Sequence, residues 1–162
     1  MSFTRSLIAR SRDREEGFTL IELMVVVLII AILIAIAIPT FLGARQRAQD
    51  RAAQSDLRNG LTAEKTVYTD NQAYDATTAN MKSIESSLNW NGAISTRPAL
   101  TVTTGTTVTA DDTVCLSETS KSGTVFNLAD VGAGASAGTF YNKGGACTTV
   151  AATLAGAWNT GW

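Results

Sequence analysis

The longest apolar run of this chain limits its possible folds more than any other feature. Residues 23–38 are sixteen consecutive apolar residues, and the 25 residues from Phe18 to Leu42 include one charged residue, Glu22. As a helix these residues would be about 37 Å long, which exceeds the roughly 30 Å of a hydrocarbon layer. Because the run is apolar on every side, it needs lipid or other protein all around it, and one small domain cannot supply that cover.

The composition of the whole chain excludes several functions. The net charge of its 162 residues is -1, so the chain lacks the basic surface that binds nucleic acid, and we predict no direct nucleic-acid binding. Histidine, the most frequent general base and metal ligand, is absent. Two cysteines are too few for a structural zinc site. We therefore predict no enzymatic activity, no metal site and no cofactor.

Two simple explanations of the run are a secretory signal peptide and a plain single-pass anchor. A signal peptide has an apolar core of about 7–15 residues and an A-x-A cleavage site, which Ala35-Ile36-Ala37 would supply. Against it, the preceding segment mixes acidic residues with arginines, and Glu22 interrupts the core. A plain anchor offers no use for Glu22, whose ionised form costs about 2.5–3.5 kcal/mol deep in a bilayer. The flanking charges do not decide which way the segment would cross the membrane, since four arginines lie on each side of the run.

A third explanation comes from the residues around the start of the run. Gly17 ends a short charged leader, and FTLIELMVVV follows it as residues 18–27, with Pro39 further along the apolar stretch. This pattern resembles the processing site and N-terminal helix of type IV prepilins and their relatives, over roughly residues 10–70. The resemblance implies that a membrane aspartic peptidase cleaves between Gly17 and Phe18 and methylates the new amine of Phe18.

Such processing would give Glu22 a role. Cleavage creates a positive charge on the Phe18 amine, and an axially shifted neighbour in a bundle of parallel helices can place its Glu22 beside that amine. In a low-dielectric surround the pair is strong, and either charge alone is penalised. This head-to-tail contact need not close, so it predicts a helical filament of identical copies. The simpler alternative is that Glu22 only sits favourably near the positive end of its own helix.

The pattern along the chain predicts an α+β fold, in which a long N-terminal helix packs on a small antiparallel sheet, as in pilins. We expect one helix from Phe18 to Tyr68, bent or locally opened at Pro39 because proline removes a backbone donor. Steps of three and four predict that its second part packs on the globular region through Leu57, Leu61, Val67 and Tyr68.

The predicted boundaries are a leader over 1–17, a membrane-spanning or filament-core helix over 18–42, an amphipathic continuation over 43–69, a connecting region over 70–98 and a sheet region over 99–162. Met81, Ile84, Leu88 and Trp90 hint at a short helix in the connecting region. Alternating β-branched residues predict these strands: Leu100–Thr104, Thr106–Ala110, Thr113–Ser117, Val125–Leu128 and Thr139–Tyr141.

The two cysteines, Cys115 and Cys147, are expected to pair if the chain is exported, closing a loop of about 33 residues. The resemblance implies that such a disulfide fastens the C-terminal region to the sheet. Two buried free thiols are the alternative. One further motif, G-x-S-x-G at 134–138, matches a nucleophile elbow, but no histidine is present to act as the base of Ser136. We expect a Gly/Ala loop there.

The resemblance implies two alternative functions. The first is the structural subunit of a type IV pilus, and the second is a pseudopilin of a type II secretion system. The main pseudopilin is expected to carry a calcium-binding loop near its C-terminus, and no acidic residue follows Cys147, which favours the pilus.

The implied partners are further copies of the chain in the filament, the prepilin peptidase and methylase, an assembly ATPase and an inner-membrane platform protein. The implied precursor is a single-pass cytoplasmic membrane protein, and the implied mature form is extracellular.

Overall fold

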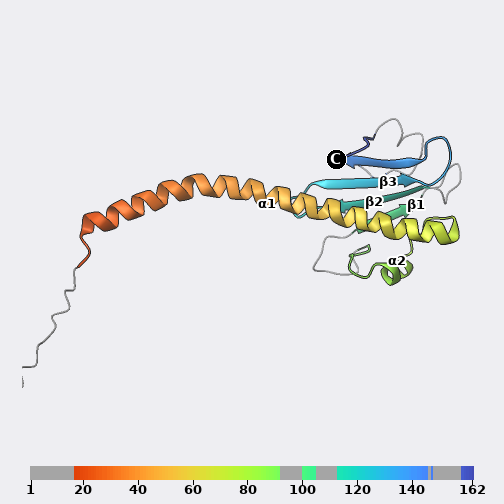
Figure 1. Ribbon diagram of the computed structural model, residues 1–162, viewed down its shortest axis with the longest axis horizontal. Coiled ribbons are helices and arrows are strands. Elements are labelled where there is room, and N and C mark those ends of the chain that lie inside the picture. The colour runs from red at the N-terminus through yellow and green to blue at the C-terminus, as the bar shows by residue number, and fades with distance from the viewer. Residues whose placement is uncertain (1–16, 92–99, 105–112, 146, 148–157) are drawn as a thin grey trace, which may run out of the picture. The chain divides into compact units, whose positions relative to one another are not determined.

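Helix α1, Leu20–Asn71, contains both the apolar run and the amphipathic stretch after it (Figure 1). The computed structural model describes residues 17–91, 100–104, 113–145, 147 and 158–162. α1 ends at Asn71 because Gln72 has a φ of 54° and donates its N–H to the carbonyl of Tyr68 at 2.8 Å, a left-handed helix cap. The prediction of one long helix is confirmed, with ends two and three residues later than expected.

The chain divides into two compact units, the first ending at Phe41 and the second spanning Leu42–Trp162. The second unit adds a short helix, α2 (Thr78–Ile84), and four strands, β1 (Leu100–Thr104), β2 (Thr113–Thr119), β3 (Val125–Val131) and β4 (Gly138–Lys143). All neighbouring strands are antiparallel, in the order β1-β2-β3-β4. The predicted α+β class is confirmed.

The strands follow the alternation that predicted them. β1 has the predicted bounds, whereas β2, β3 and β4 are longer than expected. The short helix is also present, although it ends before Leu88 and Trp90, which are buried core residues beyond it. The fifth candidate, 106–110, lies outside the described residues.

One face of the sheet packs against the second part of α1, and this interface forms the main core. The helix contributes mainly Ala53, Leu57, Leu61 and Val67, and the sheet contributes Leu100, Val102, Val114, Leu116, Phe126 and Leu128. Tyr68 lies partly buried against the same core. The predicted packing of Leu57, Leu61, Val67 and Tyr68 is therefore confirmed. Gly60 lets α1 approach β1 closely, because a Cβ at Gly60 would lie 3.1 Å from Leu100 Cδ1.

A buried carboxylate links α1 to the sheet. Asp130 on β3 forms an ion pair of 3.0 Å with Lys65 of α1 and accepts hydrogen bonds from the hydroxyls of Tyr74 and Thr139. Burial and the Asp130 carboxylate raise the pKa of Tyr74, so its hydroxyl stays a donor. A buried charge is tolerated when it is paired and hydrogen-bonded, and Asp130 meets both conditions.

Glu64 of α1 is a second buried carboxyl group, with no exposed surface. Its Oε2 accepts the backbone N–H of Asp75 at 3.2 Å, while its Oε1 has no hydrogen-bond partner within the described part of the chain. Burial raises the pKa of Glu64 from 4.5 to about 8, and the nearby Asp75 carboxylate adds to the rise. At neutral pH, Glu64 is therefore mostly protonated.

This raised pKa predicts a pH-dependent stability. Between pH 4.5 and about 8 the folded chain keeps the Glu64 proton and the unfolded chain releases it. Since the unfolded state then binds fewer protons, the free energy of unfolding falls as pH rises through this interval. Glu64→Gln, which is neutral at every pH, should remove this decline. Denaturant unfolding of both full-length proteins in detergent, from pH 4 to 9, measures the difference. A constant difference across that range would contradict the assignment.

Candidate assembly site

The predicted processing site lies at the exposed start of α1. Gly17 and Phe18 are both exposed, and 82% of the Phe18 surface is accessible. Both residues precede the first helical residue, Leu20, so the peptide bond between them lies outside the helix. Such a bond can enter a protease site without unwinding a helix. Cleavage at this bond stays a prediction.

Glu22 is part of a capping box at the start of α1. Its Oε2 accepts the backbone N–H of Thr19 at 3.0 Å and the Thr19 hydroxyl at 2.6 Å, and the Glu22 N–H donates to Thr19 Oγ1 at 3.3 Å. This reciprocal arrangement satisfies donors that a helix start leaves unpaired. The capping box supports the simpler alternative, in which Glu22 stabilises the start of its own helix.

The capping box still leaves part of the Glu22 carboxylate available. Both hydrogen bonds from Thr19 end on Oε2, and the described residues place no hydrogen bond on Oε1. A cation from another copy could therefore bind Oε1 without breaking the cap. Thr19 was missed as a functional residue, although the T-x-x-E spacing of the capping box is visible in the sequence.

The apolar side chains of the first unit are exposed on all sides of α1. Each large apolar residue over 18–41 is at least 47% accessible: Phe18, Leu20, Ile21, Leu23, Met24, Val25, Val26, Val27, Leu28, Ile29, Ile30, Ile32, Leu33, Ile34, Ile36, Ile38 and Phe41. The helix is long and apolar enough to cross a membrane, and none of its most apolar window is buried within the chain. An apolar surface of this extent marks contact with lipid or with other protein.

Pro39 lies inside α1 and does not end it. Proline removes one helical hydrogen bond. The next residue, Thr40, turns its hydroxyl back onto the helix and donates to the carbonyls of Ala37 at 2.9 Å and Ile36 at 3.3 Å. Such back-bonding satisfies the hydroxyl donor within an apolar stretch, where no water is present to bind it. A bend at Pro39 stays a prediction.

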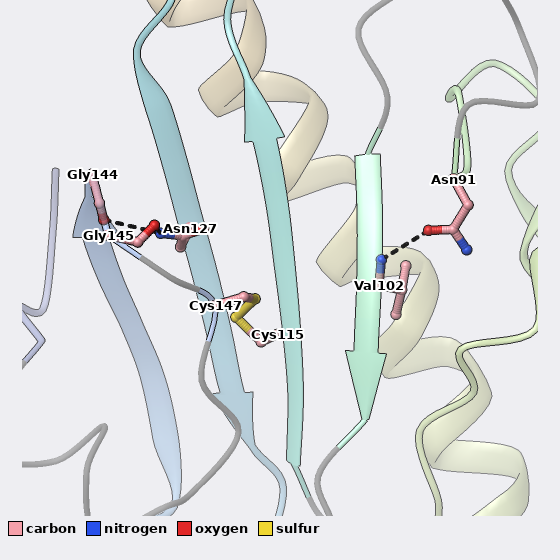
Figure 2. Close-up of a disulfide and its surroundings, with 7 residues drawn as sticks. All are labelled: Asn91, Val102, Cys115, Asn127, Gly144, Gly145 and Cys147. Carbon is pink, nitrogen blue, oxygen red and sulfur yellow. Dashed lines mark hydrogen bonds between the residues drawn. A yellow bond between two sulfur atoms is a disulfide. The ribbon is translucent and has the colours of Figure 1, made fainter.

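Cys115 and Cys147 form a disulfide, with their Cα atoms 5.9 Å apart. Figure 2 shows Cys147 reaching Cys115 on β2 from the segment that follows β4. Gly144 and Gly145, with φ of 79° and 76°, turn the chain back over the sheet there, a conformation that glycine adopts at little cost. Asn127 of β3 holds this turn by donating to the carbonyl of Gly144 at 3.1 Å (Figure 2).

The disulfide lies on the face of the sheet opposite α1. Cys115, Ala129 and Val131 are buried there, with Phe140, Cys147 and Trp158 packed against them. The alternation of β2 and β3 separates this second core from the main one, because successive residues of a strand point to opposite faces. The bridge thus fastens the segment after β4 across the sheet.

The G-x-S-x-G motif lies in the connection between β3 and β4, with Gly134 at a φ of 97°. The motif leads into β4, whereas a nucleophile elbow leads from a strand into a helix. No cluster of three or more histidine, cysteine or acidic side chains suited to a metal ion occurs among the residues that the structure describes.

The chain matches known sequences over less than half of its length. Residues 12–38 match the family described as the prokaryotic N-terminal methylation motif. The type IV major pilin protein PilA of Myxococcus xanthus is 43% identical over 67 residues, which are 41% of this chain and 30% of that protein. The type II secretion system core protein G of Escherichia coli is 36% identical over 78 residues, 46% of this chain and 52% of that protein.

A third relative is the type IV wide pilus major component PilA4 of Thermus thermophilus, 32% identical over 69 residues, which are 43% of this chain and 53% of that protein. The alignments thus span between about a third and about half of the relatives' lengths. They connect the chain to both pilus and secretion subunits. Identity at this level over part of each chain does not separate the two.

Proposed function

We propose that this chain, which belongs to the family of type IV pilins and type II secretion pseudopilins, is a structural subunit of a type IV pilus. One observation carries the proposal. Over residues 18–41 the first unit presents an apolar helix surface exposed on every side, with a single carboxylate, Glu22, four residues after the proposed new N-terminus at Phe18.

Cleavage after Gly17 would turn the start of α1 into an assembly site. The Phe18 amine becomes a cation, and methylation leaves its charge in place. In the filament, this amine would bind Glu22 Oε1 of an axially shifted neighbour, while the neighbour's Thr19 continues to hold Oε2. The surrounding apolar side chains exclude water, so the attraction is much stronger than at a wet surface. A helix placed one step out of register would bury both charges unpaired, at a cost of several kcal/mol.

Assembly would move α1 from lipid into a core of identical helices. Because the apolar surface is covered before and after this step, the transfer itself gains little hydrophobic free energy. Extraction therefore needs outside energy. The partners proposed for this role are an assembly ATPase and an inner-membrane platform protein, with the prepilin peptidase and methylase acting first. The chain itself serves as a building block rather than an enzyme.

The alternative function is that of a type II secretion pseudopilin. The similarity to core protein G of Escherichia coli supports it. The sequence after Cys147 has no acidic residue for a calcium site, which favours the pilus. Electron microscopy of filaments sheared from whole cells, with their subunits identified by mass spectrometry, separates the two. Surface filaments built of this chain support the pilus, and bare cells that keep the chain in the envelope support the pseudopilin.

The processing step makes a separate prediction about the mature N-terminus. N-terminal sequencing of the purified mature chain should read Phe-Thr-Leu-Ile-Glu, with extra mass from methylation on Phe18 alone. While the leader is attached, the nitrogen of Phe18 belongs to an uncharged peptide bond. The cation proposed for assembly therefore exists only after cleavage. A mature chain beginning at Ile38 would instead identify residues 1–37 as a signal peptide, and an uncut chain in filaments would contradict the cleavage.

A further inference from the structure

A basic hollow lies at the start of the second unit, beside α1. It has a volume of about 280 Å³, and its charged lining residues are Arg47, Asp50 and Arg51 of α1 and Lys143 of β4. Phe126 of β3 and Trp162 also line it. Three cations and one carboxylate thus converge from elements that are nearly one hundred residues apart in the sequence. No function described above uses this hollow.

The cations of the hollow are available to a ligand. Arg47, Arg51 and Lys143 are all exposed, and the structure shows no ion pair for them among the residues that it describes. Lys143 Nζ lies 6.0 Å from the centre of the Phe126 ring, a distance at which a cation and an aromatic face attract each other. Lys143 also attracts the Asp50 carboxylate of the same hollow, because its charge helps to lower the pKa of Asp50.

The single carboxylate of the hollow is already engaged. Asp50 Oδ1 accepts hydrogen bonds from the hydroxyls of Ser120 and Ser122, which lie in the turn between β2 and β3. The bond from Ser122 lowers the pKa of Asp50, so Asp50 is ionised at neutral pH. The four groups together therefore carry a net charge of about +2. An anion is the ligand that this field attracts.

The position of Arg47 indicates where that anion comes from. A Cβ placed on Gly43 would lie 3.6 Å from Arg47 Nη1, so the guanidinium reaches back along α1 to the level of Gly43. Gly43 is the first residue after Leu42, the end of the apolar run. Long basic side chains beside an apolar segment place their charges at the headgroup level of a membrane. Arg51 lies only one helical turn further, about 6 Å along the axis.

Two aromatic rings, those of Phe126 and Trp162, form part of the lining of the hollow. Trp162 packs edge-on against Phe126, with ring centres 5.0 Å apart, and against Tyr141 at 5.3 Å. Trp162 packs against the main core, and its indole N–H is buried with no hydrogen-bond partner among the described residues. The hollow thus combines three cations with two aromatic rings, and Arg47 lies five residues after Leu42 on the same helix.

We propose that Arg47, Arg51 and Lys143 bind the phosphate group of an anionic phospholipid while the precursor lies in the membrane. The proposal rests on the proposed membrane insertion of residues 18–42. It gives the precursor a second attachment to the bilayer besides its apolar helix, and this attachment must be released when the subunit enters a filament. The lipid headgroup would therefore hold the second unit against the membrane until assembly begins.

The test uses the full-length chain in detergent micelles and counts bound lipids by native mass spectrometry. The probes are phosphatidylglycerol and phosphatidylcholine with identical acyl chains, and inorganic phosphate serves as a competitor. Each basic residue near a membrane surface contributes about five-fold to the binding of anionic lipid. Arg47→Gln with Arg51→Gln should therefore weaken phosphatidylglycerol binding about 25-fold, and Lys143→Gln about five-fold. Arg58→Gln, on the same helix but outside the hollow, is the matched control and should change binding less than two-fold.

Three results would overturn the proposal. They are equal binding of the two lipids, equal losses in the Arg47/Arg51 and Arg58 variants, and displacement of the lipid by inorganic phosphate at the same concentration. Membrane fractionation of cells separates this proposal from the one on which it rests. A precursor that fractionates with membranes but does not distinguish the lipids rejects only the lipid site. A precursor absent from membranes rejects the proposed function itself.

Discussion

Glu22→Gln is expected to abolish filaments while leaving the precursor in the membrane and its leader cleaved. Glutamine has nearly the shape of glutamate and is accepted at this position of a capping box, so it can still accept the hydrogen bonds of Thr19. It carries no charge for the Phe18 amine of a neighbour. Removing one partner of a buried ion pair costs about 3–5 kcal/mol, which weakens each subunit contact more than about 100-fold. Filament yield in the sheared fraction, measured by immunoblot and electron microscopy, gives the result.

Thr19→Ala is the matched control, because it weakens the capping role of Glu22 and leaves its proposed pairing with a neighbouring copy intact. It removes the hydroxyl that caps the helix and keeps the charge of Glu22. Loss of a cap costs about 1 kcal/mol, so filaments should still form. If Glu22 only served its own helix, Thr19→Ala would be the more damaging change and Glu22→Gln would be tolerated. That pattern would contradict pairing between copies.

Loss of the disulfide is expected to produce the largest change in stability. Cys115 and Cys147 are 32 residues apart in the sequence, and replacing both with serine should lower the free energy of unfolding by about 3–4 kcal/mol. For a unit of this size, this corresponds to a fall in melting temperature of about 10 °C or more. Near-UV circular dichroism of the full chain in detergent measures it. The second core should loosen first, because the bridge fastens the segment after β4 across that face.

A reducing agent supplies the control for this double variant. Reduction should destabilise the wild type by a similar amount and leave the serine variant unchanged, since only the wild type has a bond to break. A wild type that keeps its melting temperature under reduction, while both thiols react with a thiol reagent, would show that the bridge contributes little to stability.

The fold could be predicted largely because its main signals are local. An uninterrupted apolar run and a stripe at steps of three and four specify α1, and strict alternation specifies β1 with its observed bounds. β3 extends three residues beyond its predicted end at Leu128 and includes the charged residue Asp130. In the structure, Lys65, Tyr74 and Thr139 satisfy its charge, and two of these three lie more than 50 residues away. No local pattern contains that information.

The candidate site, too, could be predicted only where its signal is local in the sequence. Gly17, Phe18 and Glu22 lie within six residues, so one short motif contains all three. The basic hollow was not predicted, because Arg47 and Lys143 are 96 residues apart in the sequence and line one hollow only in the folded chain. The protonation of Glu64 could not be foreseen from the sequence, since it depends on complete burial beside Asp75.

A filament structure by electron cryo-microscopy tests pairing between copies most directly. In filaments sheared from cells, the nitrogen of Phe18 should lie within about 4 Å of the Glu22 carboxylate of an axially shifted copy, with Thr19 of that copy still bound to the same carboxylate. Filaments in which every Glu22 contacts only its own Thr19, and every Phe18 amine lies far from any neighbouring carboxylate, would contradict the assembly mechanism.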